Sequence, residues 1–259
     1  MKMTRIYMCE DSMEGIFAAV YDAGKSGYGH AFIKLQIQGS SFCYDRELFS
    51  EYIEVKADEE KAKKVLDSVK NKIGRNAYES VMRAAASYHP QKADAIYHFI
   101  VCGFAMGDKV VKALQIDCVR QMFEINRRIL NEAQHYREFI RFFTVQEEPS
   151  VLMAVFEPEN DVLAMIVPFF ADRLNTERFI IYDKGRKDAA FYSPDYGWFI
   201  QRLTKEEQKQ MDEMEKDEGE MADLWKGYTR SISIKERENP DLQRNNLPLR
   251  FRVHMTEFQ

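Results

Sequence analysis

Four side chains between residues 135 and 183 have the chemistry needed for proton transfer. They are His135, Glu157, Asp172 and Asp183. A histidine exchanges protons near neutral pH, and carboxylates that converge in space can act as general acid and base or activate water. The same residue types also form structural salt links. The sequence therefore predicts either a catalytic site or a structural network in this stretch.

Arginines, amides and one aromatic ring that could contact nucleic acid occur in the same stretch and in the tail of the chain. The candidates are Arg137, Arg141, Phe142, Arg173, Arg186, Arg237, Asn239 and Gln243. Cations bind phosphate, and aromatic rings stack on bases. The tail also interleaves its basic residues with Trp225, Tyr228 and Phe251. This pattern is typical of a nucleic-acid surface and also of a packed segment whose arginines are paired internally.

Charge is segregated near the end of the chain. The whole chain has a formal net charge of −5, which disfavours sequence-independent binding to a polyanion. Residues 204–223, however, carry nine acids and three bases, whereas residues 226–252 carry seven bases and three acids. We expect an exposed acidic helix followed by a basic tail, and the acidic stretch 206–223 could dock a basic partner.

Several classes of site are disfavoured by spacing. The four cysteines form no CxxC pair, and the five histidines show no HExxH spacing, so no metal or other cofactor is expected. The segment Ala19–Ser26 resembles a phosphate-binding loop, but Ala19 stands where that loop needs glycine, and the helix precedes the loop instead of following it. No run approaches the roughly 20 apolar residues of a membrane helix, and no signal peptide is recognisable. A cytoplasmic protein without membrane contact is predicted.

The elements that must position these residues fall into three parts. In residues 1–57, strands are predicted near Arg5–Met8, Ala31–Ile37 and Tyr52–Val55, with a helix over Met13–Ala23, which together form a small α/β part. In residues 58–134, the apolar spacing predicts helices only. The first begins after Asp58 and stops at Gly74, and others follow at 78–87, 93–106 and 114–133.

Residues 135–259 are predicted to form a C-terminal α+β domain with a basic, helical tail. Alternation from Phe139 to Val145 predicts a strand from which Arg141 projects, and the apolar run Val151–Phe156 predicts a central strand. A helix follows near 163–174, interrupted or kinked at Pro168, and a hairpin is expected over 179–192. The fold class is therefore predicted to be α+β, with a mixed or antiparallel C-terminal sheet and a covering helix.

Motifs along nearly the whole chain resemble a bacterial family of DNA metabolism or repair proteins. The resemblance begins in the segments EDSMEGIFAAVY, AYESVMRAA and AIYHFIVCGF and is most specific from His135 onward. The matching residues there are His135, Phe139, Arg141 and Phe142; Glu157 and Pro158; Phe170, Ala171 and Arg173; Ile180–Asp183 and Arg186; and Arg237, Asn239, Pro240, Gln243 and Pro248. Phe169 stands where relatives often carry histidine, which weakens a catalytic assignment.

The resemblance implies a role in DNA metabolism beside a radical-SAM protein of DNA modification or repair function. It also implies a C-terminal domain of unknown function that elsewhere is fused to uracil-DNA-glycosylase-like domains. We therefore expect a DNA repair or modification accessory that binds nucleic acid and a radical-SAM partner. Because the cysteines of this chain are scattered, iron–sulfur chemistry would belong to the partner.

Two other functions stay open. The first is an enzyme that processes nucleic acid alone, such as a glycosidic-bond hydrolase that uses His135, Glu157 or Asp183 for proton transfer. The second is a protein adaptor that makes no DNA contact of its own.

Overall fold

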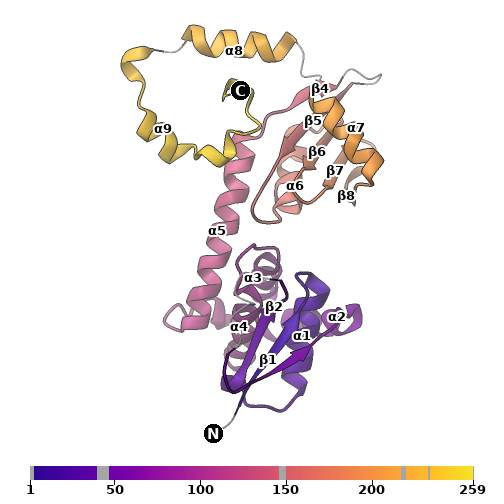
Figure 1. Ribbon diagram of the computed structural model, residues 1–259, viewed down its shortest axis with the longest axis vertical. Coiled ribbons are helices and arrows are strands. Elements are labelled where there is room, and N and C mark those ends of the chain that lie inside the picture. The colour runs from indigo at the N-terminus through magenta and orange to yellow at the C-terminus, as the bar shows by residue number, and fades with distance from the viewer. Residues whose placement is uncertain (1–2, 40–46, 146–149, 217–219, 233, 259) are drawn as a thin grey trace. The chain divides into compact units, whose positions relative to one another are not determined.

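A computed structural model describes residues 3–39, 47–145, 150–216, 220–232 and 234–258 of the chain (Figure 1). The chain divides into two compact units, Met1–Leu130 and Asn131–Gln259, called unit 1 and unit 2 below. Unit 1 contains a parallel sheet and unit 2 a mixed sheet, each with helices, so the predicted α+β class is confirmed.

The sheet of unit 1 has three parallel strands in the order β2-β1-β3. Their bounds are β1 Thr4–Cys9, β2 Ile33–Ile37 and β3 Ser50–Glu54. Helix α1, Met13–Lys25, lies between β1 and β2 in the chain, and its N-terminus is capped by the Ser12 hydroxyl, which accepts the Gly15 N–H at 3.0 Å. The three predicted strands and the helix are confirmed.

Four further helices follow, each near its predicted position. They are α2 Glu59–Ser68, α3 Arg75–Ala85, α4 Lys92–Met106 and α5 Asp117–Phe139, with short helical turns at His30–Phe32, Val69–Ile73 and Gly107–Lys112. The Asp58 carboxylate caps α2 by accepting the Lys61 N–H at 3.0 Å. Gly74 ends the π-helical turn with a φ of 137°, a conformation that L side chains rarely adopt. The predicted start and stop are both confirmed.

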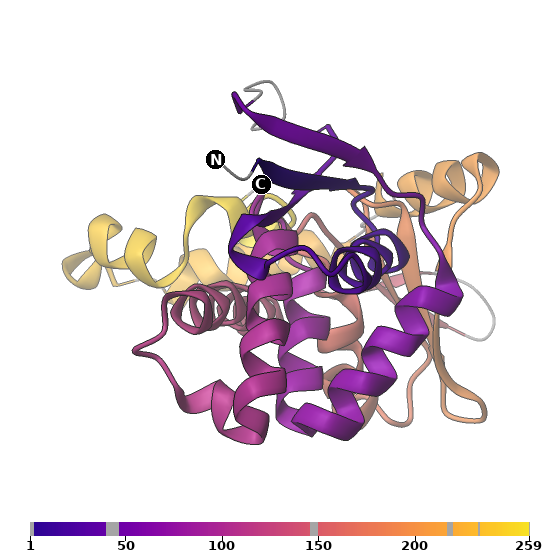
Figure 2. The same ribbon diagram turned by 90° about the horizontal axis from the view of Figure 1, so that it is seen from below.

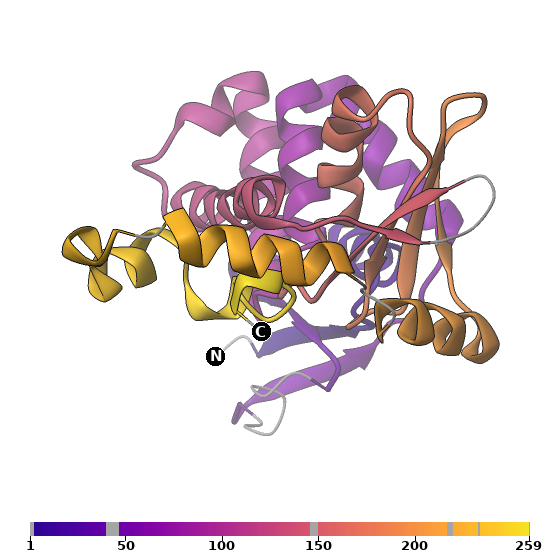
Figure 3. The same cartoon turned by 90° about the horizontal axis from the view of Figure 1, so that it is seen from above.

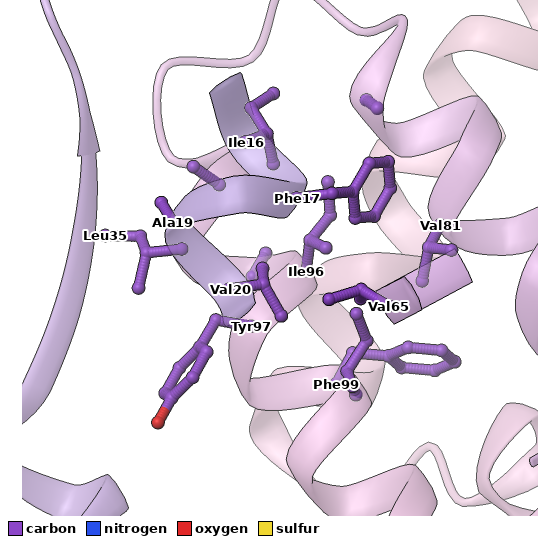
Figure 4. Packing of buried hydrophobic residues seen from close by; sticks show 14 of the residues in the cluster. Ile16, Phe17, Ala19, Val20, Leu35, Val65, Val81, Ile96, Tyr97 and Phe99 are labelled. Atoms are coloured by element: carbon purple, nitrogen blue, oxygen red, sulfur yellow. The ribbon is translucent and has the colours of Figure 1, made fainter. Parts of the chain in front are cut away.

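Apolar side chains from the sheet and the helices form one continuous core in unit 1. Figure 2 shows the three strands as a layer with the helices packed below them. Ile16 and Phe17 on α1 and Ile96 and Phe99 on α4 all belong to this core, and each is at most 1% exposed (Figure 4). The buried ammonium of Lys92 donates to the carbonyls of Ala85 and Ser87 and so caps the end of α3.

The sheet of unit 2 has five strands in the order β4-β5-β6-β7-β8. Their bounds are β4 Phe143–Val145, β5 Val151–Phe156, β6 Phe179–Asp183, β7 Asp188–Ser193 and β8 Gly197–Arg202. Only β5 and β6 run parallel, because α6, Leu163–Arg173, returns the chain between them. Pro168 lies inside α6, which continues past it.

Helices cover both faces of this sheet. Phe179 and Tyr182 on β6 face opposite sides because their positions differ by an odd number. Phe179 packs with Phe142 on the side of α6, whereas Tyr182 packs on the side of α7, Lys205–Lys216, where Met211 is buried. The exposed acidic helix that the charge pattern predicts corresponds to α7, and residues 217–219 of the acidic stretch lie outside the described residues.

The tail leaves the sheet and returns to the end of α5. It contains α8 Glu220–Ile232 and α9 Pro240–Asn246, with short helical turns at Lys235–Arg237, Leu249–Phe251 and Thr256–Phe258. Figure 3 shows α8 beside the C-terminal segment. The ring of Phe251 packs against Tyr136 and Phe139 of α5, with ring centroids 4.8 and 6.1 Å apart. The tail is therefore anchored by aromatic contacts.

One strand prediction in unit 2 needs correction, and one strand was not predicted. The predicted strand over Phe139–Val145 is wrong for its first half, because α5 continues through Phe139 and β4 begins only at Phe143. The helix extends because Phe139 packs against Phe251 of the tail as well as against His135 one turn earlier, with centroids 6.1 and 5.8 Å apart. His135 thus lies inside α5 and not at a helix-to-strand junction. Strand β8 was not predicted, since Trp198 to Arg202 are all exposed and show no buried alternation.

Three of the four cysteines lie among the described residues. Cys9 is buried, whereas Cys102 and Cys118 are half-buried thiols whose Sγ atoms lie 3.2 Å apart; Cys43 lies outside the described residues. Among the described residues, no helix combines the length and the apolar character needed to cross a membrane.

Candidate functional site

The loop after β5, residues 157–161, is the point where three of the polar candidates of unit 2 meet, namely Glu157, Asp183 and Arg186. Because β5 and β6 are parallel neighbours, their carboxyl ends lie at the same edge of the sheet, with Phe156 opposite Asp183. In sheets with parallel strands this edge is where ligand sites commonly form.

A buried carboxylate on α5 holds this loop. Glu132 is 1% exposed, and its oxygens accept the backbone N–H groups of Glu159 at 3.0 Å and Asn160 at 2.9 Å, as well as the Asn160 side chain. Arg250 in the tail pairs with Glu159 at 2.6 Å and lies 3.7 Å from Glu132. The carboxylate is thus occupied by loop and tail. It is a structural clamp and not a free base.

Asp183 and Arg186 hold the loop from the other side. The Asp183 carboxylate is fully buried and accepts the Arg186 backbone N–H at 3.0 Å and its guanidinium at 3.2 Å. Burial raises the pKa of Asp183 above its ordinary value, although the hydrogen bonds from Arg186 oppose this. Arg186 also donates to the carbonyls of Pro158 and Glu159. The pair therefore ties the β6–β7 turn to the loop.

Glu157 has an imidazole partner that the sequence did not reveal. Its Oε1 atom lies 3.2 Å from His254 Nε2, and its carboxylate is half exposed while His254 is 15% exposed. The Tyr136 hydroxyl donates to the Glu157 carbonyl at 3.0 Å, and burial raises the pKa of Tyr136. Glu157 and His254 form an accessible pair in which a proton can be exchanged.

The two remaining acid–base candidates lie elsewhere in unit 2. His135 packs between the rings of Phe139 and Phe251, and its buried Nδ1 has no hydrogen-bond partner among the described residues. Asp172 is exposed on α6. The structure therefore places Glu157 and Asp183 at one loop, whereas Asp172 lies on the surface of a helix.

Three of the predicted phosphate-binding arginines donate hydrogen bonds inside unit 2. Arg137 donates to the Met165 carbonyl at 2.6 Å, and its guanidinium lies 5.8 Å from the ring of Phe169. Arg141 donates to the Phe139 carbonyl at 3.1 Å and pairs with Glu257 at 2.7 Å. Arg186 is the third. These groups position the end of α5 and the loops around it.

A comparison with models of known protein families identifies the domain that contains these contacts. The model of a domain of unknown function, DUF4130, matches residues 90–257, which is more than half of the chain. The chain belongs to the DUF4130 family. No curated protein matches it. The DUF4130 match includes α4, α5 and nearly all of unit 2. It therefore contains the residues that hold the loop after β5, which are Glu132, Asp183, Arg186 and Arg250.

The DUF4130 tail also presents exposed rings and cations. Trp225 is 42% exposed and Tyr228 54%, and their centroids are 5.7 Å apart on α8. The Trp225 N–H donates to the Glu257 carboxylate at 3.3 Å, the same group that pairs with Arg141. Burial raises the pKa of Glu257, but hydrogen bonds from Arg141, Trp225 and the backbone, together with the charge of Arg141, outweigh burial, so the pKa lies below its ordinary value. The ring pair is thus fastened, through Glu257, to Arg141 just after the end of α5.

The remaining predicted candidates of the DUF4130 region are exposed. Arg173 is exposed on α6, Arg237 precedes α9, and Gln243 lies on α9. Asn239 caps α9, since its side chain accepts the Leu242 N–H at 3.0 Å. Phe142, in contrast, packs between Phe170 and Phe179. Among the residues that the structure describes, no three His, Cys, Asp or Glu side chains gather to hold a metal ion.

Sequence reasoning missed Glu132 and His254. For Glu132 a signal existed, because it falls on the same helical stripe as Ile125, Ile129 and Tyr136, where a carboxylate needs buried partners. For His254 no local signal existed. Its partner lies almost a hundred positions earlier in the chain, and only the return of the tail brings the two together.

Proposed function

We propose that unit 2 binds single-stranded nucleic acid through the tail surface, defined as Trp225, Tyr228, Arg237 and Arg244. The observation that carries this proposal is the exposed ring pair on α8, inside a segment whose bases outnumber its acids. Bases stack on exposed rings with about 1–3 kcal/mol each, and nearby cations hold the phosphates. Within the chain the tail surface is a basic region of an otherwise acidic protein.

The distribution of arginines supports the same surface. Arg137, Arg141 and Arg186 are engaged with carbonyls and carboxylates, whereas Arg237 is exposed and the Arg244 side chain is 59% exposed beside Asp241 at 4.0 Å. An exposed pair of this kind contributes little and is readily exchanged for phosphate. Arg173, exposed on α6, extends the set of phosphate contacts.

The biological role follows from the resemblance. A chain that binds single-stranded DNA and resembles proteins of DNA metabolism acts, in this proposal, as a repair or modification accessory in the cytoplasm beside a radical-SAM partner. The partner supplies the redox chemistry. The accessory holds the unpaired strand, because a base must leave the stack before an enzyme can reach its reactive atoms.

Fluorescence anisotropy with labelled single-stranded and duplex DNA tests this proposal. We expect the double variant Trp225→Ala/Tyr228→Ala to bind single strands about tenfold or more weakly, since two bases then have no ring to stack on. Arg237→Glu/Arg244→Glu should weaken binding as well. Lys209→Glu is the matched control. It also turns an exposed positive charge into a negative one, but on α7, and should bind like wild type. Equal affinity for all variants would overturn the proposal, and absence of binding at low salt would favour the adaptor function.

A second candidate function is supported by the pair of Glu157 and His254. A half-exposed carboxylate beside an imidazole can transfer protons in the hydrolysis of a glycosidic bond. The test is release of free base from single-stranded DNA that contains uracil, with purified protein and no partner. Glu157→Gln and His254→Gln should then lose turnover while Asp172→Asn, an exposed carboxylate on α6, retains it. No turnover by the wild-type protein would eliminate this candidate.

A further inference from the structure

Unit 1 contains a cavity that the proposed function does not use. Its volume is about 510 Å³, and it lies between α1, α2 and α4. This volume falls within the range of roughly 300–1,000 Å³ that is usual for small-molecule sites. The cavity is formed within unit 1 alone, so it is independent of the tail surface.

The walls of the cavity are mainly apolar. Val20 on α1, Val65 on α2, and Ile100 and Phe104 on α4 line it. Val20, Val65 and Ile100 belong to the core, whereas Phe104 is 50% exposed at the cavity. An apolar ligand body would therefore be enclosed by the core on one side and covered by an aromatic ring on the other.

A hydrogen-bonded pair supplies fixed polar groups. The Tyr97 hydroxyl lies 2.7 Å from His30 Nδ1, and both residues line the cavity. Figure 4 shows the Tyr97 ring pointing away from the packed side chains, with its oxygen at the far end. Burial raises the pKa of Tyr97 to about 12, so the phenol keeps its proton at neutral pH. With that proton donated to Nδ1, a neutral His30 carries its own proton on Nε2 and is itself a donor.

Two lysines give the cavity a positive charge. Lys25 and Lys64 line it, and no carboxylate is among the described residues that line it. Lys64 pairs with Glu60 at 3.7 Å, but both side chains are more than half exposed, so this contact holds the ammonium weakly. A cavity with charges of one sign and apolar walls concentrates ions of the opposite sign. Its ligand should be an anion.

Gly24 keeps the cavity accessible. It lies inside α1, where glycine lowers helix stability relative to alanine, and its φ is outside the left-handed region. A Cβ atom at this position would meet nothing within 4 Å. Neither packing nor backbone conformation therefore requires glycine here. The missing side chain leaves open space next to Lys25.

We propose that this cavity binds a small organic anion with an apolar body. The body packs between Val65 and Phe104, the anionic group pairs with Lys25 and Lys64, and the Nε2 donor of His30, whose ring is held by Tyr97, orients it. This site differs from the phosphate-binding loop that the sequence disfavours, because Lys25 lies at the C-terminal end of α1, whereas the lysine of such a loop lies at the start of a helix.

Titration with 8-anilino-1-naphthalenesulfonate, an aromatic anion, tests the proposal, and N-phenyl-1-naphthylamine serves as its uncharged analogue. We expect saturable binding of the sulfonate with one site per chain. Gly24→Phe should abolish it by filling the cavity, whereas the matched control Gly24→Ala should bind like wild type.

A second variant tests the charge without filling the cavity. Lys25→Gln/Lys64→Gln changes exposed side chains and should weaken the sulfonate about tenfold or more while leaving the uncharged analogue unaffected. Circular dichroism checks that each variant is folded. Unchanged sulfonate affinity in the lysine variant, equal binding by Gly24→Phe, or no saturable binding by wild type would each overturn the proposal.

Discussion

The two units hold their elements in place by different means. In unit 1 the positions of strands and helices follow from a continuous apolar core, in which Ile16, Phe17, Ile96 and Phe99 are buried. In unit 2 the loop at the carboxyl edge of the sheet is held by buried charged groups, above all Glu132. Apolar packing tolerates removal of a polar group but not added volume, whereas a buried ionic clamp fails when one member is removed. Unit 1 should therefore lose stability when volume is added to its core, and unit 2 should lose stability when a buried charged group is removed.

The largest effect should follow from removing the clamp of unit 2. Glu132→Ala removes the buried acceptor of two backbone N–H groups and one of the two carboxylates near Arg250, and we expect unit 2 to lose about 3–5 kcal/mol of unfolding free energy. Both tryptophans, Trp198 and Trp225, lie in unit 2, so denaturation followed by tryptophan fluorescence reports on this unit.

The control for this change lies on the same helix. Glu138 is exposed and accepts one hydrogen bond from Gln134, so Glu138→Ala should change stability by no more than about 0.5 kcal/mol. If Glu132→Ala unfolded at the denaturant concentration of wild type, the clamp would not be what holds the loop.

A smaller effect is expected from adding one methyl group in unit 1. At Gly15 a Cβ would lie 2.7 Å from the Glu10 carbonyl oxygen, so Gly15→Ala should cost about 1–3 kcal/mol. At Gly24, on the same helix, the same methyl meets nothing, and Gly24→Ala should stabilise the unit by up to about 1 kcal/mol. Thermal unfolding followed by circular dichroism measures both. Equal shifts for the two variants would contradict the close packing around α1.

The smallest effect concerns the tail at acid pH. The folded pKa of Glu257 lies below its ordinary value of 4.5, so its contribution to stability is present above that value and is lost as pH falls through the folded pKa. Protonation weakens the contacts of Glu257 with Arg141 and Trp225. We expect Trp225 emission, in a Trp198→Phe background, to change below about pH 4.5, and Glu257→Gln to lack this step. If Glu257→Gln showed the same acid transition, protonation of Glu257 would not be its cause.

The sequence predicts well whatever depends on local periodicity or on a local cap. The strands and helices of unit 1, the start at Asp58 and the stop at Gly74 all follow from such signals. Strand β5 and the hairpin of β6 and β7 follow for the same reason. Each of these features is decided by residues that are neighbours along the chain.

Features that depend on distant partners were not predictable. Phe139 stays helical because Phe251 packs on it from the tail, although the alternation after it is typical of a strand. His254 meets Glu157 for the same reason, and Arg141 was predicted to face phosphate without knowledge of Glu257. Binding of nucleic acid stays a prediction. The structure moves its strongest candidates from the arginines near α5 to the exposed rings and cations of α8 and α9.

The salt dependence of single-stranded DNA binding tests this account most directly. If Arg237 and Arg244 each neutralise a phosphate, the slope of log affinity against log salt should become shallower by about 1.4 in Arg237→Glu/Arg244→Glu, which is close to 0.7 for each phosphate of a single strand. Lys209→Glu should keep the wild-type slope. A double variant with the wild-type slope and affinity would show that the tail surface does not bind the strand.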